Sequence, residues 1–175
     1  MAAWLALRIA SRSGPGSIDR ALVESAALLH DVDKALPRSG TDGSRRHGET
    51  GARWLAARGY GELTDAVTLH PVTILPDDVL AGRLLDDGSI EAQVVAYADK
   101  RGRQRVVSMA DRFDAWTRRH PTGWSGPTVA LARERAETLE RQVCEAAGVR
   151  PEDVRRLRWT GRALATARTV PGRAA

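Results

Sequence analysis

Leu28-Leu29-His30-Asp31-Val32-Asp33-Lys34-Ala35 places a histidine and an aspartate side by side at the end of an apolar helical segment. Such a pair is costly to bury in that segment without compensation. A divalent cation offers compensation, because imidazole and carboxylate are both good ligands for first-row metals. Adjacent residues on a helix diverge by about 100°, so the cation must lie in the angle between His30 and Asp31. Other helices must then complete its shell.

Lys34 and Asp33 follow this pair on the same predicted helix. Lys34 lies one turn beyond His30 and three residues beyond Asp31, which puts it on their side of the helix. There it either holds a phosphate near the metal or forms a surface ion pair with Asp31 or a neighbouring acid. Asp33 is predicted to point away from His30 into solvent, with a third acid near the metals as the alternative.

Helical patterns extend outward from this stretch to both ends of the chain. Ala, Leu, Arg and Glu are abundant, while runs of alternating β-branched residues are nearly absent. We expect helices over residues 2–11, 18–35, 46–58, 62–69, 90–105, 108–120 and 128–147, a short helix from residue 151, and an irregular stretch over residues 71–89. In the second helix, Leu28 and Leu29 are expected on the apolar face. The prediction is an all-α fold.

The composition limits the classes of partner and compartment. A formal charge of +5 and a pI of about 10.3 favour anionic partners, namely nucleotides, phosphorylated metabolites or nucleic acid, although an arginine-rich solvated surface gives the same balance. The single cysteine, Cys144, cannot form an internal disulfide, which fits a reducing cytoplasm. We interpret Cys144 as a small core residue. No stretch approaches the 18 or more apolar residues of a membrane span. The apolar start, interrupted by Arg8, is read as an amphipathic helix rather than a signal peptide.

Two of the remaining histidines strengthen the metal interpretation. The chain has four histidines, and His47 and His70 both fall at predicted helix ends, beside Gly48 and Pro71. Asp99 then stands as a single acid in an otherwise apolar helical face, directly before two cations. In chain order the sequence therefore offers a His-Asp pair, two separate histidines and a distant aspartate.

This ordered set resembles the HD superfamily, in particular its single-domain members with an HDIG-type motif. The residues that carry the resemblance are Leu28–Ala35, His47-Gly48, His70-Pro71, Tyr97-Ala98-Asp99-Lys100-Arg101 and the segment Arg105–Phe113. The resemblance covers about residues 20–115. It implies a compact HD-domain helical bundle over residues 1–120, with a C-terminal helical extension over residues 121–175 packed on the same domain.

The resemblance also implies a chemistry, the metal-dependent hydrolysis of a phosphate ester or anhydride, with a nucleotide or other phosphorylated small molecule as substrate. Carried over, one or two divalent cations (Fe, Mn, Co, Ni or Mg) bind to five residues. His30, Asp31 and Asp99 hold the first metal, and Asp31, His47 and His70 hold the second. Asp31 and Lys34 are the expected catalytic residues, and the expected phosphate-binding residues are Lys34, Arg46, Lys100 and Arg101.

One departure from the family leaves other functions open. The family's first histidine lies upstream of the His-Asp pair, and no histidine precedes His30 here. We expect that ligand to lie before Met1, or else the chain to be a variant with a poorer first metal site. A catalytically impaired nucleotide sensor is therefore the first competing function. Nucleic-acid binding through the arginine-rich residues 133–173 is the weaker one, because glutamates interrupt those arginines.

Overall fold

Helices form the regular structure of the described residues, which are 1–37, 46–103, 105–120 and 126–155 of this computed structural model. The helices are α1 (Ala2–Ser13), α2 (Arg20–Leu29), η1 (Val32–Ala35), α3 (Glu49–Ala56), η3 (Gly61–Leu63), α4 (Thr64–Leu69), η4 (Val72–Ile74), α5 (Asp78–Leu85), α6 (Ile90–Arg101), α7 (Met109–Arg119), α8 (Gly126–Ala147) and α9 (Pro151–Arg155). Within these residues the only β-type pairing is an isolated bridge between Gly102 and Val106. The predicted all-α fold is confirmed.

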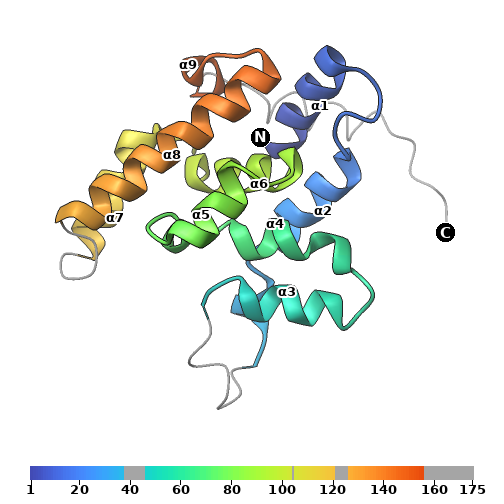
Figure 1. Cartoon of the computed structure of the whole chain (residues 1–175), viewed down its shortest axis with the longest axis horizontal. Helices are drawn as coiled ribbons and strands as arrows, with labels where there is room; N and C mark the ends of the chain where they lie inside the picture. Colours follow the sequence, from blue (N-terminus) through green and yellow to red (C-terminus); the bar gives the residue numbers. More distant parts are fainter. Residues whose placement is uncertain (38–45, 104, 121–125, 156–175) are drawn as a thin grey trace.

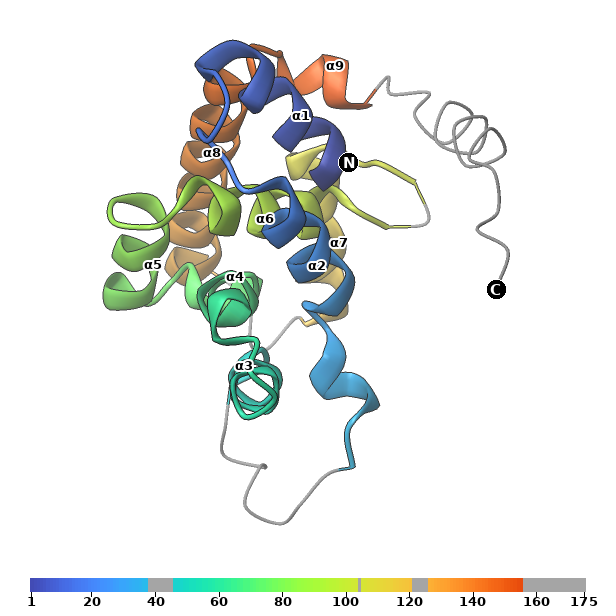
Figure 2. The ribbon, with the colours of Figure 1, turned by 90° about the vertical axis from the view of Figure 1, so that its right-hand side faces the viewer.

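Helix α6 is the centre of the bundle (Figure 1). It contacts α1, α2, α4 and α8, and α3 lies on the far side of α4. Figure 2 shows the same order from the side, with α4 between α6 and α3. Because neighbours surround α6, buried residues occupy almost its whole circumference, including Val94, Val95, Ala96 and Tyr97.

Short polar side chains begin four of these helices. Ser89 and Ser108 accept hydrogen bonds from backbone N–H groups at the starts of α6 and α7, and Asp19 does so for α2. Such caps satisfy donors that the first helical turn leaves without partners. Asp77 caps α5 by accepting from the N–H groups of Val79 and Leu80, at 3.1 Å each. The prediction of an irregular stretch over residues 71–89 was therefore wrong, since η4 and α5 lie there.

Helix α2 ends earlier than predicted, and this changes which residues share a face. The helix stops at Leu29, and residues 32–35 form the separate 3₁₀ turn η1. The buried residues of α2 are Val23 and Ala26, whereas Leu28 is 85% exposed. The expectation that Leu28 faces the core was wrong, because the core-facing side of α2 is rotated away from it.

The C-terminal helices pack onto the rest of the bundle. Helix α8 contacts α1, α5, α6 and α7, and α9 contacts α8. Arg8 on α1 donates to the carbonyls of Ala147 and Gly148 at the end of α8, at 3.4 and 3.3 Å. Cys144 is buried in this contact region, as predicted. Residues after 155 lie outside the described part, and the division of the chain at residue 120 stays a prediction.

Among the helices that the structure describes, none has both the length and the apolar character needed to cross a membrane.

Candidate metal centre

Three histidines lie at helix ends that meet beneath α6. His30 follows the last residue of α2, and His70 follows the last residue of α4. His47 directly precedes Gly48, the residue before α3. Gly48 has a φ of 91°, and a Cβ atom there would lie 2.6 Å from the carbonyl oxygen of Val67. Only glycine permits this backbone conformation and this close approach, so Gly48 lets His47 come near α4.

Each of these imidazoles is oriented through its Nδ1 atom. His30 Nδ1 lies 2.8 Å from the carbonyl oxygen of Ala27, and His70 Nδ1 lies 2.7 Å from that of Val67. A carbonyl can only accept, so Nδ1 carries the proton in both rings. His47 Nδ1 lies 2.7 Å from the carboxylate of Asp33. An imidazole that carries its proton on Nδ1 leaves Nε2 as the atom able to bind a metal.

The three Nε2 atoms converge on the carboxylate of Asp31. His47 Nε2 lies 2.9 Å and His70 Nε2 3.6 Å from Asp31 Oδ1, and His30 Nε2 lies 3.5 Å from Asp31 Oδ2. His47 and His70 place their Nε2 atoms 3.2 Å apart. Asp99 joins from α6, with its Oδ1 atom 3.7 Å from His30 Nε2. The structure thus brings together all five residues predicted as metal ligands.

The charge state of the cluster suits a cation. The pKa of Asp31 is held well below its usual range, first by its contact with His70 and then by Lys34 and His30. Burial of the carboxylate acts in the opposite direction but is outweighed. Burial lowers the pKa of His70, which favours its neutral ring. Three Nε2 atoms and an ionised carboxylate therefore lie close together, an arrangement that a divalent cation stabilises. Two overlapping groups have ligand atoms within 4.8 Å of one another, His30-Asp31-His70 and Asp31-Asp33-His47.

The prediction that Asp33 faces solvent was wrong. Its side chain is 11% exposed, and its Oδ2 atom accepts from His47 Nδ1 and from the backbone N–H of Gly48 at 3.1 Å. Burial opposes its ionised form, but these two hydrogen bonds bring the pKa of Asp33 below its ordinary value. The prediction failed because α2 ends at Leu29, so the helical geometry assumed for residues 30–35 does not apply. Asp33 orients His47 from behind.

Lys34 and Arg46 are both exposed and both paired with an acid. Lys34 Nζ donates to Asp31 Oδ2 at 2.6 Å, which is the ion pair given above as an alternative to phosphate binding. Arg46 donates to Asp77 Oδ2 at 2.8 Å, at the start of α5. Of the two, only Lys34 lines the cavity beside the cluster. Arg46 is engaged elsewhere, so the structure does not support its predicted phosphate role.

Lys100 and Arg101 are buried, which corrects their expected role in phosphate binding. Lys100 Nζ donates to the carbonyl of His70 at 2.8 Å and to that of Ala96 at 3.3 Å, and burial lowers the pKa of Lys100 to about 8. Arg101 is 1% exposed, and its guanidinium is enclosed by hydrogen-bonding partners. Neither side chain reaches the cavity; Lys100 instead fixes the end of α4 that carries His70.

A cavity of about 780 Å³ adjoins the cluster and receives His30, Asp31, Lys34 and Asp99 along its wall. Arg112 on α7 also lines it, 4.0 Å from Asp99 Oδ1, and sequence reasoning did not single this residue out. The signal was weak because arginine is common throughout the chain, and only the fold brings α7 alongside Asp99. The cluster therefore opens onto a space that contains both acidic and basic side chains.

Comparison with known proteins gives one match, to the family model described as the HD domain, over residues 1–116. That range contains all five clustered residues and about two thirds of the 175-residue chain. No curated protein and no solved structure matches the chain. The all-helical fold and the match over most of its length show that the chain belongs to the HD-domain family.

Proposed function

We propose that this protein is a metal-dependent phosphohydrolase that acts on a phosphorylated small molecule, namely a nucleotide. The observation that supports this most strongly is the convergence of three histidine Nε2 atoms on Asp31, beside a cavity that Lys34 also lines. Membership of the HD-domain family supports metal-dependent phosphohydrolase chemistry. The single cysteine and the absence of a membrane-spanning helix among the described residues accord with a cytoplasmic location, which is part of the proposal.

Five residues would hold the metal. We assign His30, Asp31 and Asp99 to one position and Asp31, His47 and His70 to a second, so Asp31 would be shared. A divalent cation supplies Lewis acidity, which makes water a nucleophile at neutral pH and stabilises charge on phosphate oxygens. The imidazoles are already fixed through Nδ1 by Ala27, Asp33 and Val67, so their Nε2 atoms need little rearrangement to bind.

Lys34 would turn from Asp31 to the substrate. In the structure its ammonium group neutralises Asp31 at 2.6 Å, and its side chain is 63% exposed on the cavity wall. A bound cation would take over that neutralisation and leave the lysine able to bind a phosphate oxygen. Lys34 would therefore supply the positive charge that binds the phosphate group.

The test is a screen for phosphate release from a panel of nucleotides, with manganese, iron, cobalt, nickel or magnesium, alongside metal analysis of the purified protein. We expect bound metal at one or two equivalents and release that stops on chelation. Metal and nucleotide binding without turnover would favour the impaired sensor. Absence of both metal and turnover would overturn the proposal.

Lys34→Ala should lower kcat/KM by about 10- to 100-fold, in line with the ~1.5–3 kcal/mol of a hydrogen bond to a charged group. Metal content should be retained or rise, because Asp31 loses a competing cation. The measurement is steady-state kinetics together with metal analysis. Arg83→Ala is the matched control, since it removes an exposed cation that pairs with Asp65, and neither residue lines the cavity. Loss of metal from the Lys34 variant would contradict its assignment to phosphate.

Asp33→Ala should weaken metal binding by about 10- to 100-fold, the usual effect of removing a carboxylate that orients a ligating histidine. Asp33→Asn should lose less, because its amide oxygen can still accept from His47. Titration of the metal-free protein with Mn²⁺ by calorimetry measures both. Asp65→Ala, which removes an exposed carboxylate paired with Arg83, is the control and should bind metal normally. Equal affinity in the Asp33 and Asp65 variants would show that Asp33 does not orient a ligand.

A further inference from the structure

Three arginines gather at the mouth of the cavity beside the candidate metal centre. They are Arg103 and Arg105, which flank the turn after α6, and Arg112 on α7. We propose that they form a subsite for a second phosphate group, so that the substrate is a small molecule with at least two phosphates. This inference rests on the proposed function and specifies which substrates the same site would take.

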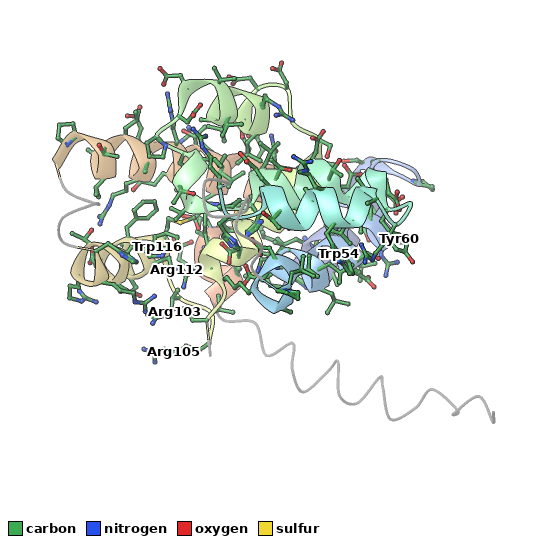
Figure 3. The ribbon with its side chains drawn as sticks, turned by 90° about the horizontal axis from the view of Figure 1, so that it is seen from below. Trp54, Tyr60, Arg103, Arg105, Arg112 and Trp116 are labelled. Carbon is green, nitrogen blue, oxygen red and sulfur yellow. The ribbon has the colours of Figure 1, made fainter. Side chains whose placement is uncertain are left out.

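The backbone on either side of Arg103 and Arg105 is anchored to the bundle. Gly102 and Val106 form an antiparallel bridge, and Val107 N–H donates to the carbonyl of Arg101 at 3.0 Å. Arg101 Nε donates in return to the carbonyl of Val107 at 2.5 Å, from inside the bundle. Figure 3 shows Arg103 and Arg105 projecting at the edge of the molecule beside Arg112. Their guanidinium groups therefore extend from a fixed base.

Arg112 has hydrogen-bonding capacity that the protein does not use. Its side chain is only 15% exposed, yet its Nε atom is buried without a hydrogen-bond partner among the described residues. Its nearest acid is Asp99, and the 4.0 Å between Nη2 and Oδ1 is too long for a hydrogen bond. Its guanidinium lies over the ring of Trp116, 4.4 Å from the centroid. Stacking fixes the plane of the guanidinium, and an anion beside it would satisfy the remaining donors.

Of the three arginines, Arg112 has an acid within 4.0 Å, namely Asp99. Neither Arg103 nor Arg105 forms an ion pair within the part of the chain that the structure describes. Three guanidinium groups at one cavity repel one another unless an anion separates them, and a phosphate group accepts bidentate hydrogen bonds from arginine. Solvation of an ordinary basic surface would explain exposed arginines, but not the buried and unsatisfied Nε of Arg112.

The three arginines line two adjoining cavities. The same three arginines line the 780 Å³ cavity, with His30, Asp31 and Asp99, and a neighbouring hollow of about 1030 Å³ over α7. The arginines thus stand next to the metal centre, and one molecule can place one phosphate at Asp31 and another at Arg112. The lining of the 780 Å³ cavity also includes the apolar residues Ala27, Leu28, Val95, Ala98 and Val106. A wall of this kind suits the base or another flat part of a small molecule.

A nucleic-acid strand fits this surface less well. The hollow over α7 continues to Arg118 and Arg119 but is interrupted by Asp111 and Asp114. Sequence-independent strand binding uses aromatic side chains on which successive bases stack. Figure 3 places Trp54 and Tyr60 at the other side of the view from the arginines. Trp116 is 9% exposed and lies under Arg112. The observations favour one small polyanion.

The test compares two small probes, orthophosphate and the non-hydrolysable methylenediphosphonate, which has one more phosphate-like group. Calorimetry on the full chain, once with EDTA and once with Mn²⁺, gives the ratio of their affinities. In the wild type we expect methylenediphosphonate to bind at least 10-fold more tightly under both conditions. Arg112→Ala, and Arg103→Ala with Arg105→Ala, should reduce this preference to about 2-fold or less, and Arg112→Lys should restore part of it. Because Arg112 covers Trp116, binding should also change tryptophan fluorescence, and Trp116→Phe should remove that signal.

Arg150→Ala is the matched control, because Arg150 is exposed and pairs with Asp153 away from both cavities. An equal loss of preference in this control, or a wild-type protein without preference, overturns the subsite. Mn²⁺-dependent nucleotide hydrolysis with an unchanged probe preference in the Arg112 variant would remove the inference and leave the proposed function. A preference for methylenediphosphonate in EDTA that depends on the arginines, without any nucleotide hydrolysis, would support the subsite and contradict the proposed function. Equal binding of a single-stranded oligonucleotide in wild type and arginine variants is expected, and selective loss of such binding would favour a strand instead.

Discussion

Asp31→Ala should abolish metal binding and reduce turnover by about 10³-fold or more, the scale seen when a residue essential to the chemistry is removed. Asp31 is the one side chain that all three Nε2 atoms approach, between 2.9 and 3.6 Å. It would also be shared between both metal positions. Without it, His30, His47 and His70 would have to hold a dication with little negative charge to compensate it.

The measurement is metal content by mass spectrometry together with nucleotide hydrolysis. Asp31→Asn separates charge from volume and should also lose metal, because an amide is a poorer ligand than a carboxylate. Asp65→Ala serves as the carboxylate control. Circular dichroism should show the helical fold intact, since Asp31 is partly exposed and lies outside the core. Normal metal content in Asp31→Ala would remove this residue from the centre, and the same metal loss in Lys34→Ala would show that Lys34 had been misassigned.

Glu140→Ala should lower the free energy of unfolding by about 3–5 kcal/mol, the usual effect of leaving a buried charge without its partner. Glu140 on α8 accepts a short hydrogen bond from Arg101 Nη1 and another from the hydroxyl of Tyr97 at 2.9 Å. Arg101 also donates to Tyr97 at 2.6 Å and to the carbonyl of Pro151 at 3.1 Å. Arg101 is 1% exposed, so water cannot replace the lost carboxylate.

Urea denaturation followed by circular dichroism measures this effect. Glu137→Ala is the matched control, because Glu137 lies one turn earlier on α8 and is exposed. It should change stability by no more than about 0.5 kcal/mol. Replacing both Arg101 and Glu140 with apolar residues should be less harmful than Glu140→Ala alone, because no buried charge is left over. A Glu140 variant as stable as the Glu137 variant would contradict the role assigned to the pair.

The candidate site could be predicted from the sequence where it depends on residue type and on helix ends. His47 and His70 stand beside Gly48 and Pro71, and the structure places both histidines at helix ends. Chemical type alone marked Asp99 as an unusual acid in an apolar segment. The prediction that these residues converge also required the assumption that the helices pack around one centre.

Other features depended on packing that the sequence does not reveal. Asp33 was misplaced because a periodic pattern continues through Ala35, whereas His30 bonds to Ala27 and α2 stops. Lys100 and Arg101 were expected to bind phosphate, but both side chains are buried. Their burial is determined by α4 and α8, which come from distant parts of the chain and supply the partner atoms.

The enclosure of Arg101 also bears on when the centre takes shape during protein synthesis. All five candidate ligands are encoded within the first 99 residues, but Glu140 and Pro151 come later. A polypeptide leaves the ribosome with its N-terminus first, at roughly 5–20 residues per second. For some seconds the nascent chain has the ligands but lacks the carboxylate that neutralises Arg101 beneath the turn after α6. We therefore expect ribosome-bound chains that end before α8 to bind metal poorly, and the centre to mature only after α8 has emerged.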